Sequence, residues 1–323
     1  MNRGARPGYP GYVQRVAIKL GLQIPNFSYG TGVAELFPTV IAQAQEAEAA
    51  GFDSVFVMDH FYQLPGLGAP EEPMLEAYTT LGALGAATQR VQLGTLVTGN
   101  SYRNPTLLAK AITTLDVISQ GRAILGIGTG WFELEHDSLG YEFGTFTDRF
   151  NKLDEALAII LPMLRGERVT FDGKYYRTDE AFANPRFRDH IPLMIGGSGE
   201  KKTIPLAARH FDHLNIIAGF DELPRKVQVV KDACEKIGRD PATLETSVLA
   251  IALIDENVTA DMIPDDFKQQ AVFGSPDQIA DQIKTKVLDA GVDGVILSAA
   301  TVNGYKPGGV TAVAELLKPV LGL

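Results

Sequence analysis

A carboxylate–imidazole pair in this sequence has the residue types needed for acid–base chemistry. Asp59 and His60 come directly after the apolar run Ser54 to Met58, which has the composition of a buried strand. The imidazole of His titrates near neutral pH, and a neighbouring carboxylate can orient or charge it, so the pair suits proton transfer. The alternative is a polar pair that merely closes a turn.

A first glycine-rich loop, Leu125 to Trp131, ends another apolar run and carries Gly126, Gly128 and Gly130. These glycines would let a ligand approach exposed backbone N–H groups closely. A dinucleotide-binding G-x-G-x-x-G would need glycine at 131, where Trp131 stands, so Rossmann-type binding is not expected. A tight strand exit without a ligand is the alternative.

A second glycine-rich loop follows a predicted strand and opens a helix. It contains Gly196, Gly197, Ser198 and Gly199. Unpaired backbone donors and the positive end of a helix predict phosphate binding there, against a plain glycine-rich connection. A P-loop would need glycine in place of Lys201, and a nucleophile elbow would need glycine in place of Glu200, so neither motif is present.

Two further sets of reactive residues are weaker candidates. His210, Asp212 and His213 lie where a helix leads into a strand, and no other Cys or His completes a ligand spacing, so no metal site is predicted. Cys234 is the one cysteine of the chain, which excludes an internal disulfide, and we expect it to pack as a small hydrophobic residue.

The elements that must position these residues alternate between short apolar runs and amphipathic helical patterns, as in βα units around a parallel sheet. Most of the runs are nearly continuously apolar, as strands buried on both faces are. The predicted strands are Ala17 to Gln23, Ser54 to Met58, Val91 to Thr98, Ala123 to Gly128, Leu193 to Gly196, Leu214 to Ala218, Ser247 to Asp255 and Gly294 to Ser298.

The number of βα units predicts an α/β protein with a closed (β/α)8 TIM barrel rather than an open doubly wound sheet. The segment Ala50-Gly51-Phe52-Asp53 before one strand recurs as Ala290-Gly291-Val292-Asp293 before another, with a glycine suited to ending a helix in each. We expect residues 1–323 to form a single domain. Catalytic groups of such barrels lie at the carboxyl ends of the strands, where Asp59, His60 and both loops fall.

Three insertion segments, near 61–73, 130–147 and 166–190, exceed what a bare barrel needs. We place them at the C-terminal face of the barrel, where they could cover an active site. Within the third, two short β-like runs flank Asp172-Gly173, which predicts a hairpin.

The charge of the chain limits the possible partners. Its 323 residues include 29 Lys and Arg against 39 Asp and Glu, a net charge of −10, and no basic stripe suits nucleic acid. No apolar run reaches the ~18 residues of a membrane span, and Met1 to Pro10 lacks the apolar core of a signal peptide. We therefore expect a cytoplasmic protein without nucleic-acid or membrane partners.

Taken in order, these motifs resemble the luciferase-like monooxygenase superfamily of flavin and deazaflavin oxidoreductases over nearly the whole chain. The resemblance is closest to the branch that uses coenzyme F-420, an 8-hydroxy-5-deazaflavin. The segments that carry it are Gly21 to Pro25, Gly51 to His60, Leu93 to Thr98, Arg103 to Pro105, Gly121 to Trp131 and Pro192 to Gly199.

The resemblance implies a role for each matching residue. Asp59 would bond the deazaflavin ring, and His60 would donate a proton near the carbon that accepts the hydride. Leu96 and Val97 would form a bulge behind the ring, often a cis peptide in this family, with Thr98 beside it. The residues that would line the cofactor's side chain are Thr129 and Gly130, and those that would hold its phosphate are Gly196, Gly197, Ser198 and Gly199.

The resemblance also implies the reaction class. We expect an oxidoreductase that moves a hydride between coenzyme F-420 and a small organic substrate, as a homodimer. Sugar-phosphate dehydrogenases of this branch have Glu where this chain has Trp131, so a hexose phosphate is not the expected substrate. The alternatives are an FMN-dependent monooxygenase using reduced flavin and dioxygen, and a non-catalytic cofactor-binding protein.

Overall fold

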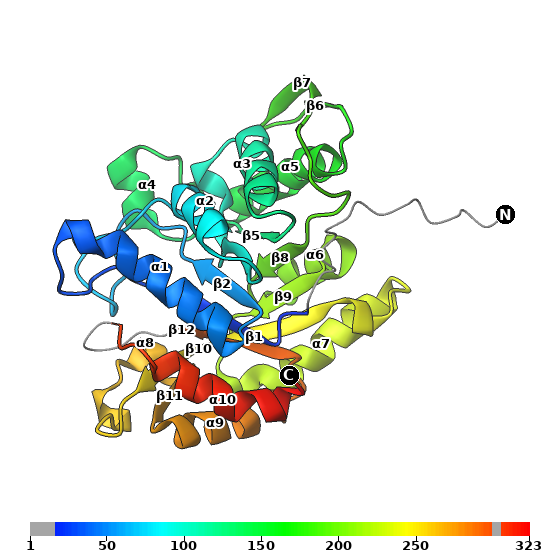
Figure 1. The fold of residues 1–323 in the computed structure, drawn as a ribbon. Coiled ribbons are helices and arrows are strands. Elements are labelled where there is room, and N and C mark those ends of the chain that lie inside the picture. The colour runs from blue at the N-terminus through cyan, green and yellow to red at the C-terminus, as the bar shows by residue number, and fades with distance from the viewer. Residues whose placement is uncertain (1–16, 299–304) are drawn as a thin grey trace.

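The computed structural model describes residues 17–298 and 305–323 and contains a closed barrel of parallel strands, as predicted (Figure 1). Each barrel strand pairs with the next, and β10 closes the ring by pairing with both β9 and β12. Residues Met1 to Pro10, where the sequence has no signal-peptide pattern, lie outside the described residues. The barrel strands are β1 (Leu20–Ile24), β2 (Ser54–Val57), β3 (Gln92–Thr95), β5 (Ala123–Gly128), β8 (Leu193–Gly196), β9 (His213–Ile216), β10 (Glu245–Ile254) and β12 (Gly294–Ser298).

The predicted strands are all present. Three have the predicted ends, Ala123 to Gly128, Leu193 to Gly196 and Gly294 to Ser298, and the others differ at one or both ends. The largest difference is in Val91 to Thr98, which the structure divides into β3 and a separate short strand, β4 (Thr98–Gly99), paired with β5. The chain leaves the sheet between them at Leu96 and Val97. That interruption points the loop into the mouth of the barrel instead of continuing the sheet.

The helices form an outer ring around the barrel (Figure 1). Gly51 ends α1 with a φ of 92°, and Gly291 has a φ of 88° before β12, so both recurrent glycines adopt the left-handed conformation predicted for them. The main helices are α1 (Val33–Ala50), α2 (Ala77–Ala87), α3 (Pro105–Ile118), α5 (Phe146–Leu164), α6 (Thr203–His210), α7 (Leu223–Lys236), α9 (Pro276–Ile283) and α10 (Gly309–Leu321). No helix within the described ranges combines the length and the apolar character that a membrane crossing needs.

Apolar side chains fill the inside of the barrel. Phe56, Ile124, Met194 and Ile296, from four different strands, form a buried cluster on which Leu96 and Val97 pack. The rest of the core lies between the strands and the outer helices, where Cys234 is fully buried as predicted. A ligand therefore has no room inside the barrel and must bind above this cluster, at the mouth.

One strand and several short elements were not predicted. The final residues of β10 pair with β11 (Ala271–Gly274). The sequence analysis missed this strand because a four-residue run that ends in glycine is too short for its pattern to distinguish a strand from a turn. The short helical elements are η1 (Asn100–Tyr102), η2 (Phe220–Glu222), η3 (Pro241–Thr243), η4 (Ala260–Met262), α8 (Asp265–Lys268) and η5 (Lys284–Leu288).

The predicted insertions differ in structure. Residues 61–73 contain only turns and bends, and residues 130–147 contain the short helix α4 (Glu133–Leu139) before α5 begins at Phe146. The capping box of Thr145 and Asp148 fixes that beginning.

The hairpin in residues 166–190 is present, but its turn is longer than predicted. Its strands are β6 (Val169–Asp172) and β7 (Arg177–Ala181), so residues after Asp172-Gly173 do not pair at once. The carboxylate of Glu155, on α5, accepts the backbone N–H groups of Lys174, Tyr175 and Tyr176 at 2.8, 2.8 and 3.1 Å. Those three residues therefore bind α5 instead of extending the ladder.

Candidate active site

A cavity of about 480 Å³ lies at the mouth of the barrel, and every predicted site residue lines it. It is bounded by residues at or after the carboxyl ends of β2, β3, β5, β8 and β9, while no described residue of β1, β10, β11 or β12 lines it. The predicted residues gathered there are Asp59, His60, Leu96, Val97, Thr98, Thr129, Gly130, Gly196, Gly197, Ser198 and Gly199.

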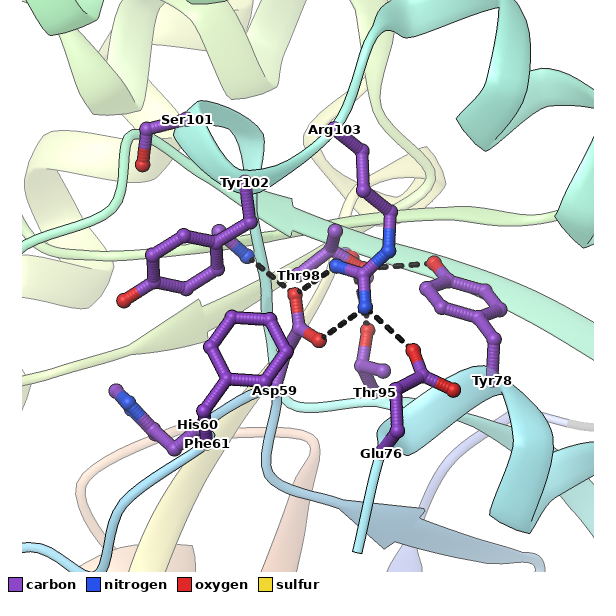
Figure 2. Close-up of polar contacts among 12 residues, drawn as sticks. Asp59, His60, Phe61, Glu76, Tyr78, Thr95, Thr98, Ser101, Tyr102 and Arg103 are labelled. Atoms are coloured by element: carbon purple, nitrogen blue, oxygen red, sulfur yellow. Dashed lines mark hydrogen bonds and ion pairs between the residues drawn. The ribbon is translucent and has the colours of Figure 1, made fainter. Parts of the chain in front are cut away.

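Asp59 is a buried carboxylate held by a guanidinium. Its two oxygens accept from Arg103 at 2.6 and 2.8 Å, and one also accepts the backbone N–H of Gly99 at 3.0 Å (Figure 2). Arg103 reaches Glu76 at 2.7 Å and lies over the ring of Tyr78. Burial raises the pKa of the Asp59 carboxyl, which Arg103 opposes. The pair fixes the carboxylate at the floor of the cavity.

His60 is oriented by a second buried carboxylate, Glu135, at the first turns of α4. Nδ1 of His60 lies 3.0 Å from Oε2 of Glu135. The other Glu135 oxygen accepts the backbone N–H groups of Phe61 and Tyr62 at 2.5 and 2.9 Å, and the Tyr102 hydroxyl donates to Oε2. Burial alone would raise the pKa of the Glu135 carboxyl. The hydrogen-bond donors, with His60 the strongest of them, outweigh burial and hold that pKa below its usual value.

The ionised Glu135 determines which nitrogen of His60 is free. A carboxylate can only accept, so Nδ1 carries the proton in the bond to Glu135 and Nε2 keeps its lone pair in the neutral ring. No described residue makes a hydrogen bond to Nε2, and His60 lines the cavity. The arrangement can accept a proton from a ligand at Nε2 and, once charged, return it.

The wall beside Asp59 is formed where β3 and β4 are interrupted. The Leu96–Val97 peptide bond is cis, which confirms the prediction from the resemblance. The hydroxyl of Thr98 bonds to the Tyr78 and Thr95 hydroxyls at 2.7 and 2.6 Å (Figure 2). Val97 faces Gly196, where a Cβ would come within 3.1 Å of its side chain.

The two glycine loops meet at the other end of the cavity. Gly130 and Gly197 have φ values of 80° and 140°, which other residues rarely adopt. The backbone N–H groups of Ser198 and Gly199 donate to no acceptor in the described part of the chain, just before α6 begins. Unpaired donors ahead of a helix start form a site for an anion.

The sequence analysis missed residues that complete the site. Glu135 and Tyr102 were absent from it, and Arg103 was only part of a motif. The signal for Glu135 was an acidic residue within an insertion next to the first glycine loop, but two acidic neighbours, Glu133 and Asp137, gave no means of choosing. Burial separates them, because Glu135 is fully buried.

The histidines near β9 have other partners. His213 is buried and its Nε2 lies 2.7 Å from the Ser247 hydroxyl, while Asp212 lies 2.9 Å from Nε2 of His190. Across residues 17–298 and 305–323, no three His, Cys, Asp or Glu side chains gather as a metal site would require.

Comparison with known proteins relates this geometry to named relatives. An F420-dependent glucose-6-phosphate dehydrogenase of Nakamurella multipartita is 38% identical over 68% of this chain and 65% of its own length. An F420-dependent hydroxymycolic acid dehydrogenase of Mycobacterium tuberculosis is 31% identical over 72% of this chain and 65% of its own. The chain thus spans less than two thirds of the length of these relatives.

Solved structures support the fold. An F420-dependent secondary alcohol dehydrogenase in complex with an F420-acetone adduct superposes with a TM-score of 0.81 at 21% identity, over 95% of this chain and 99% of the other. Monooxygenase RslO1 from Streptomyces bottropensis superposes with a TM-score of 0.75 at 18% identity, over 93% and 98%. The family model described as luciferase-like monooxygenase matches residues 18–261, so the chain belongs to that family.

Proposed function

We propose that this chain is a coenzyme F-420-dependent oxidoreductase that transfers a hydride between the deazaflavin and a small organic substrate. The strongest support is one cavity with a proton-transferring histidine at one end and unpaired backbone donors at the other. The relatives at 31% and 38% identity carry names with the same cofactor.

The residues present fit a phosphorylated cofactor with a flat ring. The N–H groups of Ser198 and Gly199 suit the phosphate, and Thr129 and Gly130 would line the side chain. Leu96 and Val97 offer an apolar surface to one side of a ring. Both oxygens of Asp59 already accept from protein donors, so a bond to the ring would use a remaining lone pair of that carboxylate.

When bound, the deazaflavin supplies a two-electron acceptor and donor for hydride. The protein then has two tasks, to hold the substrate carbon against the ring and to move the coupled proton. His60 takes or gives that proton at Nε2, while Glu135 stabilises the charged imidazolium and keeps Nδ1 protonated. Trp131 and Phe132 lie edge-on to the His60 ring, each with its ring centroid 5.7 Å away, and give that ring apolar neighbours.

Separate titrations with F-420 and FMN, followed by cofactor fluorescence, test the cofactor. We expect tight binding of F-420, and tight binding of FMN with no response to F-420 would instead favour a flavin monooxygenase. His60→Ala should lower turnover far more than cofactor affinity, and an equal loss of both would make His60 a binding residue. Tight F-420 binding without turnover across a broad substrate panel would favour a non-catalytic binding protein.

We also infer that the protein works in the cytoplasm as a homodimer on a small molecule. A net charge of −10 and a single buried cysteine agree with a reducing compartment without nucleic-acid partners. Light scattering on the purified protein tests the dimer, and a monomer at micromolar concentration would refute it.

A further inference from the structure

The second glycine-rich loop is tied to neighbouring backbone at its two ends. At one end the N–H of Gly197 donates to the Asn215 carbonyl at 3.0 Å. At the other end the Gly199 carbonyl accepts the N–H of Ile204 at 2.9 Å. Between these bonds lies Ser198 with a glycine on each side, and glycine backbone has more conformational freedom than that of other residues. Unpaired N–H groups in such a loop bind an anion well only if something holds them in place.

A lysine outside the cavity makes the contact that can hold this loop. Nζ of Lys226, on α7, donates to the Ser198 carbonyl at 3.3 Å and lies 2.8 Å from Oε1 of Glu200. Lys226 is 8% exposed and is not among the residues that line the cavity. Within residues 17–298 and 305–323, no other side chain makes a hydrogen bond to the backbone of residues 197–199.

The contact with the carbonyl fixes the direction of the next N–H group. The Ser198–Gly199 peptide is trans, and in a trans peptide the C=O and the N–H point in opposite directions. Because the carbonyl is turned to Lys226, the N–H of Gly199 points away from that lysine. Gly199 lines the cavity and Lys226 does not, so this N–H is directed to the cavity. The cation also polarises the peptide, which strengthens the N–H as a donor.

The positive charge of Lys226 is already paired, so its effect on an anion passes through the peptide. Its Nζ lies 2.8 Å from Glu200 and 3.9 Å from Glu222. Arg225 also binds the carboxylate of Glu200, but its side chain is 61% exposed and makes no hydrogen bond to the loop. The two neighbouring cations therefore share one carboxylate and differ in their contact with the Ser198 carbonyl.

We propose that Lys226 is a positioning residue for the phosphate of the cofactor, because it orients the Ser198–Gly199 peptide so that the loop's N–H groups receive that phosphate. This inference rests on the proposed function and adds to it a residue that acts from outside the cavity. Removing Lys226 should weaken the binding of a phosphorylated cofactor and spare the binding of the same ring without a phosphate.

The test compares F-420 with 8-hydroxy-5-deazariboflavin, which has the ring and the ribityl chain but no phosphate. Cofactor fluorescence gives the Kd of each compound, and thermal unfolding shows whether each variant is folded. We expect Lys226→Met to raise the Kd of F-420 about 10-fold, the scale of one hydrogen bond to a charged group, and that of the phosphate-free compound less than about 2-fold.

Arg225→Met is the matched control. It removes an equal charge and an ion pair with the same carboxylate, but it leaves the contact between Lys226 and the Ser198 carbonyl. Because Arg225 is largely exposed, both Kd values should stay within about 2-fold of the wild type.

A second variant covers the case in which Lys226→Met does not fold. Glu200→Gln keeps Lys226 but removes the carboxylate that holds its Nζ. It should raise the Kd of F-420 about 3-fold and leave the Kd of the phosphate-free compound unchanged, since a neutral amide holds the ammonium group less tightly.

The outcomes separate this inference from the function on which it rests. An equal loss of affinity for both compounds would make Lys226 a structural residue and overturn the inference. Equal losses in Lys226→Met and Arg225→Met, or an unchanged Kd of F-420 in every folded variant, would also overturn it. If the wild type binds FMN and not F-420, the proposed function is refuted, and FMN against riboflavin gives the same comparison for Lys226. Binding of neither phosphorylated cofactor overturns both.

Discussion

Replacing Glu135 by glutamine keeps His60 in place but changes the carboxylate that orients it, so this variant tests the role of Glu135. The side chain keeps its shape and can still accept one backbone N–H, but it loses its negative charge. Its amide would then present either a neutral acceptor or an N–H to Nδ1 of His60. In the second case Nδ1 must accept, which places the proton on Nε2 and removes the free lone pair.

The expected loss follows from the bond that is removed. Nδ1 of His60 lies 3.0 Å from a fully buried carboxylate, and a hydrogen bond to a charged group contributes roughly 1.5 to 3 kcal/mol net. Since each 1.36 kcal/mol is a factor of ten in rate, turnover with saturating F-420 should fall roughly 10- to 150-fold. The affinity for F-420 should change little, because Glu135 does not line the cavity.

Steady-state turnover, F-420 titration and thermal unfolding of the same preparations measure this effect. Nitrogen-15 NMR of the histidine rings adds a readout independent of activity, since the chain has only 5 His and the His60→Ala variant assigns the relevant signal. Glu133→Gln, on the exposed face of the same helix, is the matched control. It removes an equal charge without touching His60.

Unchanged turnover in a folded Glu135→Gln variant would refute the assigned role of Glu135. So would a lower melting temperature with a loss of turnover no larger than in Glu133→Gln, because that result would make Glu135 a purely structural residue. Tyr102→Phe is a second control, because it removes one hydrogen-bond donor to the carboxylate but leaves the charge on Glu135. It should lower turnover much less than Glu135→Gln does.

Further predictions concern stability. Asp59→Ala leaves the guanidinium of Arg103 largely buried without its main partner and should lower the free energy of unfolding in urea by about 3 kcal/mol or more. In Gly126→Ala the new Cβ would lie 2.1 Å from a β3 carbonyl oxygen, so we expect a loss of about 1 to 3 kcal/mol, whereas Gly32→Ala meets nothing within 4 Å and should change stability by less than about 0.5 kcal/mol. The pKa of Glu135 lies below its ordinary 4.5, so its contribution is present above that pH and is lost as the pH falls through the lowered pKa. The difference in unfolding free energy between wild type and Glu135→Gln should therefore shrink in acid, and a difference independent of pH would contradict the ionised state of Glu135.

Local pattern was enough to predict the barrel and most of its site. Strands buried on both faces have distinctive compositions, and residues that directly follow them must gather at one face of a parallel barrel, which placed Asp59, His60 and both glycine loops correctly. The cis bond at Leu96 and Val97 came from the family resemblance, because no composition rule predicts it. That residues 1–323 form one domain stays a prediction.

What escaped prediction depends on contacts between residues distant in sequence. Glu135 lies 75 residues from His60, and only the folded path of the segment after β5 brings them together. The hairpin was placed correctly, but Glu155 on another element lengthened its turn by binding three backbone N–H groups. In both cases a carboxylate binds backbone N–H groups of a loop that is distant in sequence, and hydrophobic periodicity gives no information about such partners.

The cavity lies on one side of the barrel, and this position affects which parts of the barrel can accept insertions. Residues after β2, β3, β5, β8 and β9 form it, while β1, β10, β11 and β12 contribute no described residue. Among the described residues, the ring of similar strands thus has one side that lines the cavity and one side that does not. We expect that a strand such as β11, which pairs in parallel with the last residues of β10, can be gained or lost on the side that does not line the cavity with little effect on the cavity. That side is where an inserted domain or a fused partner would be tolerated best, and where descendants of this chain could diverge in assembly while keeping their reaction.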